Sequence, residues 1–138
     1  MKKFNYLLQA ILIYIFFFIG RLLGLNISRI FFSYLFCLFG PIFKSKKIIK
    51  KNLDIFSKNL SNNRKSEIVK NMWKNYGMTF IEYIFLNHFR KKNNHMTIYG
   101  EDVLSNIIRK KKPVIFVSGH FANFELMSME ITKKKIDL

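Results

Sequence analysis

The chain has 138 residues, enough for one small domain and too few for two sizeable cores. Half of the residues are hydrophobic and 16 are Phe, yet Lys and Arg number 24 against 8 Asp and Glu. Lys, Asn, Ile and Phe are all abundant, so the net charge of +16 identifies no partner by itself. One cysteine, Cys37, excludes an intrachain disulfide framework.

The N-terminal stretch, residues 4–43, is apolar and contains no acidic residue. Its first run covers residues 6–20 and is not followed by a small-residue cleavage site, which favours an uncleaved anchor over a signal peptide. A spanning helix needs roughly 20 apolar residues. We therefore expect the run to recruit residues 22–25, with Arg21 reaching toward the interface.

A second apolar segment, residues 30–43, contains Gly40-Pro41, which would break or kink a helix near its end. We therefore expect this segment to be a hairpin partner in or on the membrane and not a second full span. Five lysines follow directly and form a polybasic cluster of the kind attracted to anionic lipid head groups: Lys44, Lys46, Lys47, Lys50 and Lys51. The expected division is therefore a membrane anchor and apolar hairpin in residues 1–43 and a cytoplasmic part in residues 44–138.

Two helices are expected next. Apolar residues at helical spacing predict one over residues 47–56, and the turn at residues 60–63 supplies N-cap residues for a second over residues 64–87. The second helix has an apolar and aromatic stripe that is typical of a core-facing surface. Its members are Ile68, Met72, Trp73, Tyr76, Phe80, Ile81, Ile84 and Phe85.

The pattern changes after the polar linker at residues 90–94. A short strand is expected at residues 96–99, a helix at 101–110, a buried parallel-type strand at 114–117 and a helix at 122–134. This alternation predicts an α/β domain.

The segment after the second expected strand contains the candidate catalytic residues. His120 would stand at the carboxyl end of a buried strand, where open α/β sheets place their ligand crevices. Glu125 follows five residues later, which on a continuous helix would be about 140° away around the axis. The two side chains therefore meet only if the chain turns between them, and Gly119 permits such a turn.

Acyl transfer to a hydroxyl needs these residue types. A hydroxyl is a weak nucleophile until a base takes its proton, and imidazole titrates near working pH. A carboxylate bonded to the other ring nitrogen fixes the tautomer and stabilises the imidazolium that forms.

The motif residues 119–125, Gly-His-Phe-Ala-Asn-Phe-Glu, closely resemble the G-H-F-G-N-W-E motif of the bacterial lipid A late acyltransferases, the lauroyl and myristoyl transferases of the H-x4-D/E group. Residues 51–53 resemble the R-x-N-L region of that family, and residues 100–104 resemble its G-x-E-x-L segment. Ala122 and Phe124 stand where the family usually has Gly and Trp.

The resemblance implies that His120 is a general base, that Glu125 orients it, and that Asn123 shapes the site. An ordinary cap at the start of a helix is the alternative role for Asn123. The resemblance also implies an α/β acyltransferase sandwich, of which residues 44–138 would be the N-terminal part, after the N-terminal membrane helices. Since family members are longer, we expect the sandwich to be incomplete at the C-terminus and the chain alone to show little activity.

The reaction implied by the resemblance moves a fatty acyl group from an acyl carrier protein thioester to a hydroxyl of a lipid A precursor at the bacterial inner membrane. It needs no cofactor, and no metal-ligand spacing is present. The acidic carrier protein and the basic chain have opposite charges, which would accelerate their encounter.

Other interpretations of the function also fit the sequence. The acceptor could be another glycolipid or a phospholipid, and the chain could be an inactive truncated fragment. Lysine clusters at residues 110–112 and 133–135 would also fit a membrane-anchored basic scaffold or a nucleic-acid-binding module, but no nucleic-acid motif is present and such runs are usually solvated. His88 and His95 are expected to be plain surface residues.

Overall fold

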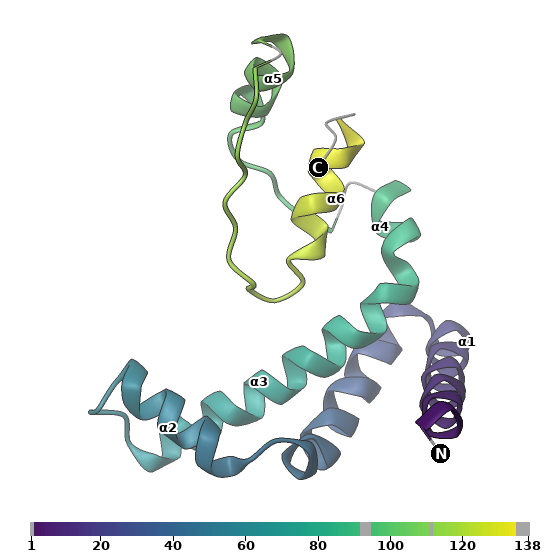
Figure 1. Cartoon of the computed structure of the whole chain (residues 1–138), viewed down its shortest axis with the longest axis vertical. Helices are drawn as coiled ribbons and strands as arrows, with labels where there is room; N and C mark the ends of the chain where they lie inside the picture. Colours follow the sequence, from purple (N-terminus) through teal and green to yellow (C-terminus); the bar gives the residue numbers. More distant parts are fainter. Residues whose placement is uncertain (1, 92–94, 111, 135–138) are drawn as a thin grey trace. The chain divides into compact units, whose positions relative to one another are not determined.

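A computed structural model describes residues 2–91, 95–110 and 112–134 (Figure 1). Its helices are α1 (Lys2–Phe43), α2 (Lys46–Phe56), α3 (Asn62–Glu82), α4 (Leu86–Lys91), α5 (Glu101–Lys110) and α6 (Glu125–Lys133), with a 3₁₀ turn at Tyr83–Phe85 between α3 and α4. The chain divides into two compact units, Met1–Ile84 and Phe85–Leu138.

Helix α1 is broken at Gly24, whose φ of 72° and ψ of 170° are outside the helical region. The limbs on either side, residues 2–23 and 25–43, fold back on each other. The rings of Phe16 and Phe32 lie 5.7 Å apart between centroids, and the Ser28 hydroxyl donates to the Gly20 carbonyl at 2.7 Å. Glycine tolerates the positive φ that this reversal requires.

Of the break or kink that the sequence predicted at Gly40-Pro41, the break is wrong, because the second limb continues through Pro41 to Phe43. Pro41 lies in the last turn of α1, where its missing N–H removes a single backbone hydrogen bond and few residues remain to be displaced.

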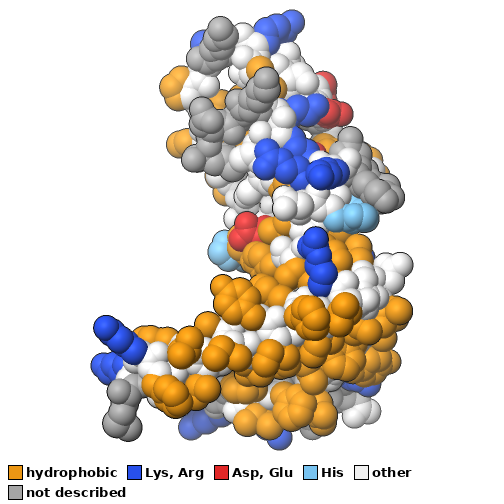
Figure 2. All heavy atoms as spheres, turned by 90° about the vertical axis from the view of Figure 1, so that its right-hand side faces the viewer, with side chains coloured by type: hydrophobic (Ala, Val, Ile, Leu, Met, Phe, Trp, Pro, Cys, Tyr) orange, Lys and Arg blue, Asp and Glu red, His pale blue; other side chains and the backbone are white. Residues whose placement is uncertain are grey.

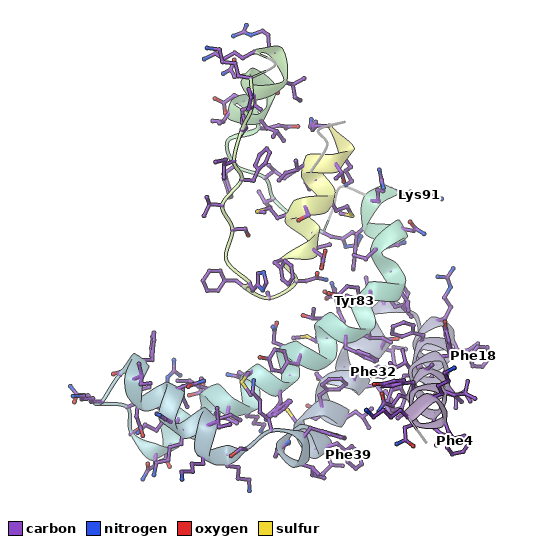
Figure 3. All side chains as sticks on the ribbon, in the orientation of Figure 1. Phe4, Phe18, Phe32, Phe39, Tyr83 and Lys91 are labelled. Atoms are coloured by element: carbon purple, nitrogen blue, oxygen red, sulfur yellow. The ribbon has the colours of Figure 1, made fainter. Side chains whose placement is uncertain are left out.

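The core of the first unit lies between α1 and α3. Phe32 and Ile81 are fully buried there, and Figure 3 shows Phe32 on the second limb of α1, facing α3. The ring of Phe80 on α3 lies 5.4–6.3 Å, between centroids, from four rings of α1, those of Phe16, Phe17, Phe32 and Phe36. Each such pair contributes about 0.5–1.5 kcal/mol beyond the area it buries.

Glycine allows α1 and α3 to approach closely. A Cβ atom at Gly77 of α3 would lie 2.2 Å from the backbone oxygen of Phe32, and one at Gly20 of α1 would lie 2.3 Å from the Ile81 side chain. The same contact contains an ion pair, in which Arg29 Nε donates to Glu82 Oε1 at 2.7 Å. Side-chain exposure is 31% for Arg29 and 10% for Glu82, so the pair is largely removed from water.

Helix α3 confirms the predicted cap, since the Ser61 hydroxyl accepts a hydrogen bond from the Arg64 N–H at 3.3 Å. The predicted core stripe is confirmed at Trp73 and Ile81, which are buried. The predicted end at residue 87 is wrong, because α3 ends at Glu82 and a 3₁₀ turn separates it from α4.

The outward surface of α1 is apolar. Phe4 and Phe18 project from its first limb with 63% and 65% exposure (Figure 3), and Figure 2 shows hydrophobic side chains covering one face of the part formed by α1 and α3. By length and composition, α1 is the described helix that could cross a membrane. Exposed apolar area of this extent marks an interaction surface, and it favours membrane association.

The second unit has a small core in which α4 and α6 meet. Phe89 and Ile131 are buried there, and Lys133 Nζ donates to the Phe89 carbonyl at 3.4 Å. Helix α5 has the predicted bounds, with acidic residues in its first turn and basic residues in its last, as the helix dipole favours.

The predicted α/β sandwich is contradicted, because the described residues contain helices and irregular segments but no strand. Residues 96–99 and 114–117 are irregular, and Ile115 and Val117 are 89% and 90% exposed. Apolar β-branched composition expresses a preference for a pleated, half-buried surface, but a strand exists only where a neighbour pairs with its backbone. Neither segment has such a neighbour in the part of the chain described.

Candidate functional site

His120 lies at the end of the irregular segment that precedes α6, and its side chain is exposed. Its imidazole ring stacks on the ring of Phe124, with 4.1 Å between centroids and 4° between planes. Phe124 therefore covers one face of the imidazole and leaves uncovered the ring edges that bear the two nitrogens.

The chain turns sharply between His120 and α6. The Phe121 N–H donates to the Gly119 carbonyl at 2.9 Å, and a Cβ atom at Gly119 would lie 2.4 Å from the Phe121 ring. Ala122 has a φ of 46°, in the left-handed region that costs an L-residue about 1–2 kcal/mol. The left-handed turn residue is thus Ala122 and not Gly119, and α6 starts at Glu125 and not at residue 122 as predicted.

Glu125 is the first residue of α6 and is half-buried. The N-terminal turn of a helix favours a negative side chain. Glu125 lines a hollow of about 340 Å³ together with Leu86 and Arg90 of α4 and Ser128 of α6. His120 does not line this hollow.

The structure thus places the two predicted catalytic side chains in different surroundings. His120 is stacked on Phe124, and no hydrogen bond joins it to Glu125 within the described residues. Exposed side chains change rotamer on the picosecond to nanosecond timescale, and catalytic hydrogen bonds are often long before substrate binds. The roles of His120 and Glu125 stay predictions.

Asn123 is half-buried beside the turn. Its backbone carbonyl accepts from the Leu126 N–H at 3.2 Å, which starts the hydrogen bonding of α6. The cap position itself is held by Phe124, which makes no side-chain capping bond. A site-shaping role for the Asn123 side chain stays a prediction.

The other two histidines belong to the second unit. His88 is exposed, as expected, and its ring lies 5.2 Å from that of His95 between centroids. His95 is packed edge-on against Phe89, with centroids 4.6 Å apart, so the expectation of a plain surface residue is wrong for it. Within the described residues, no three His, Cys, Asp or Glu side chains gather as metal ligands would.

Phe124 is the site residue that the sequence analysis did not single out. Its ring supports one face of the imidazole, and its position four residues after His120 was the available signal, since a turn between them brings such residues close. Ala122, which stands where the resembled family usually has Gly, occupies the left-handed position of the turn.

Comparison with protein families matches residues 1–137 to the family described as bacterial lipid A biosynthesis acyltransferase. Comparison with curated proteins and with solved structures gives no match. The matched region contains α1 to α6 and the whole motif at residues 119–125.

Proposed function

Because the chain belongs to the bacterial lipid A biosynthesis acyltransferase family and is an acyltransferase, we propose that it transfers a fatty acyl group from an acyl carrier protein thioester to a hydroxyl of a lipid A precursor. The observation that supports this most is the family match across residues 1–137 together with His120 and Glu125 at the spacing of the family motif.

The proposed reaction has one bond-making and one bond-breaking event. Neutral His120 takes the proton of the acceptor hydroxyl as its oxygen attacks the thioester carbonyl, so that a C–O ester bond forms. The C–S bond then breaks, and the carrier leaves as a thiol that takes the proton back from the imidazolium. No covalent acyl-enzyme is needed, because the acceptor attacks the donor directly.

Glu125 would orient His120 by accepting a hydrogen bond from one ring nitrogen, which leaves the other free to act as base. This requires the imidazole to leave its stacked position on Phe124, or Glu125 to turn out of the hollow that it lines with α4. Substrate binding would supply the energy for that rearrangement, and Asn123 would shape the same turn.

The proposed location is the cytoplasmic side of the bacterial inner membrane, with α1 as the anchor. The apolar outward surface of α1 and the lysines that follow it support this, since polybasic segments next to a membrane are drawn to anionic lipids. The net charge of +16 would also accelerate encounter with an acidic carrier protein.

The test is an acyl transfer assay in membranes of cells that produce the protein, with acyl carrier protein thioester as donor and a lipid A precursor as acceptor. His120→Ala should lower the rate by roughly 10² to 10⁴, the usual contribution of a positioned base, and His88→Ala, on α4, is the matched control. Acylation of a phospholipid in place of the lipid A precursor would contradict the proposed acceptor, and full activity of His120→Ala would contradict the proposed base.

A further inference from the structure

The first unit contains a groove far along the chain from His120, which we name the lysine groove. Its volume is about 520 Å³, within the roughly 300–1,000 Å³ of typical ligand sites. It lies between the end of α1 and the helices α2 and α3. Its apolar wall is formed by Ile49 and Leu53 of α2 and by Val69 and Trp73 of α3.

Four lysines also line the groove: Lys46 and Lys50 of α2, and Lys65 and Lys70 of α3. Lys65 is paired with Asp54 at 2.6 Å between Nζ and Oδ1, and no acidic side chain is part of the lining. Lys46, Lys50 and Lys70 are exposed. An apolar cavity edged by cations matches a ligand that has a hydrocarbon part and a negative head.

The surroundings identify where such a ligand comes from. Cys37 and Pro41 of α1 border the groove, and the neighbouring Ile42 and Phe43 are 76% and 84% exposed. If α1 lies in the membrane as proposed above, this end of the groove faces the lipid boundary. Lysines at that boundary are placed where they meet lipid phosphates.

We propose that the lysine groove binds one anionic phospholipid of the membrane, with an acyl chain against Ile49, Leu53, Val69 and Trp73 and the phosphate at Lys46, Lys50 and Lys70. A free phosphate ion would leave the apolar wall uncovered, and a diffuse attraction of the polybasic segment to the surface would not use this wall. The proposal rests on the membrane association of α1 and not on the chemistry of His120.

Trp73 reports on the groove directly, because it is the only tryptophan of the chain. Its ring lies against Gly40, where a Cβ atom would be 2.3 Å away, and its indole nitrogen has no hydrogen-bond partner within the described residues. Packing, and not a hydrogen bond, therefore holds the ring, so its emission depends on what fills the groove.

The experiment uses the full chain in phosphatidylcholine vesicles that contain a small, equal fraction of brominated phosphatidylglycerol or brominated phosphatidylcholine. Bromine quenches tryptophan emission at short range, so we expect the anionic lipid to quench Trp73 strongly and the neutral lipid weakly. Equal quenching by both lipids would overturn the proposal.

Helix α2 offers a matched pair of variants. Lys46→Gln with Lys50→Gln removes two lysines that line the groove, whereas Lys47→Gln with Lys51→Gln removes two from the same helix that do not. The first pair should weaken the preference for the anionic lipid roughly tenfold, as loss of one to two contacts with a head group would. The second should keep it, and an equal loss in both would show diffuse surface attraction instead.

Three further measurements test the apolar wall and separate the other occupants. Val69→Phe, which fills the wall without changing charge, should reduce quenching while circular dichroism and membrane binding stay unchanged; if that variant unfolds, the lysine pairs still decide. Inorganic phosphate, added at matched ionic strength, should not displace the brominated anionic lipid and should therefore not restore the emission of Trp73. Full protection of Trp73 by an acyl carrier protein thioester would mean that the groove takes the acyl donor, and the proposal would be wrong even if the acyltransferase activity stands.

Discussion

The two units of the chain hold their functional surfaces in different ways. In Met1–Ile84, two long helices share a ring cluster around Phe80, a glycine contact at Gly77 and a largely buried ion pair. In Phe85–Leu138, His120 lies on an irregular segment with exposed apolar side chains, and its imidazole ring stacks on the ring of Phe124, four residues later. Long-range packing fixes the first surface, whereas short-range contacts fix the second, so their substitutions should have separable effects.

Gly77→Ala should have the largest effect on stability and act on the first unit. The added methyl group would meet the Phe32 backbone oxygen, which cannot move as a flexible side chain would. Forced overpacking costs about 1–3 kcal/mol. Thermal unfolding of the full chain in a neutral detergent should shift to lower temperature, and Asn71→Ala, at an exposed position of α3, should shift it little. A stabilised Gly77→Ala protein would show that α1 and α3 do not approach this closely.

Glu82→Gln should destabilise the same contact by about 2 kcal/mol, within the range for a charged hydrogen bond that is lost. Arg29 would then keep its charge in a poorly hydrated position. Glu67→Gln is the matched control, because its ion pair with Arg64 is exposed on both sides and such pairs contribute little. Equal unfolding shifts for the two variants would mean that water reaches the Arg29 pair freely.

Ala122→Gly should instead stabilise the turn before α6, by about 1 kcal/mol, because glycine adopts positive φ without the cost that alanine carries. Hydrogen exchange at the first amides of α6 should slow, while amides of α3 stay unchanged. Ala122→Val should have the opposite sign. Faster exchange in Ala122→Gly would mean that the residue does not hold the left-handed conformation.

The smallest effect concerns pH. The hydrogen bond from Lys65 lowers the pKa of Asp54 below its usual value of 3.8. Because the folded-state pKa is the lower one, the stabilisation is fully present above the unfolded-state pKa and is lost as pH falls through the folded-state pKa. Asp54→Asn should therefore slightly lower the stability of the first unit at neutral pH and leave its stability below the folded-state pKa unchanged, so that the acid side of the stability profile becomes flatter. If Asp54→Asn left the acid side of the stability profile unaltered, the hydrogen bond from Lys65 would not be the cause of that pH dependence.

Local signals predicted much of the helical structure. The Ser61 cap and the bounds of α5 depend on nearest neighbours in sequence, and both are as expected. A hairpin within residues 1–43 was expected, but its turn at Gly24 was missed, because residues 22–25 were expected to extend the first helix. A lone glycine within an apolar run gives no sign of the Phe16 and Phe32 contact that makes reversal at that point favourable. Residues 114–117 have the composition of a buried strand, but composition cannot supply the neighbour that a strand needs.

The motif itself could be read from the sequence, and the family match covers the same segment. The arrangement of side chains around the motif could not be predicted, because it depends on the backbone or side-chain dihedral angles of three residues. Ala122 takes the left-handed conformation, His120 turns onto Phe124, and Glu125 points into the hollow with α4. None of these has a signature in the spacing of residue types.

The most direct test of the proposed mechanism is a double-mutant cycle on acyl transfer in native membranes, with His120→Ala, Glu125→Gln and the two combined. Residues that act as one unit are strongly non-additive. We expect Glu125→Gln to slow the reaction, His120→Ala to slow it more, and the combined variant to be no slower than His120→Ala alone. If the two losses multiply in the combined variant, Glu125 does not act through His120, and the proposed pair is wrong.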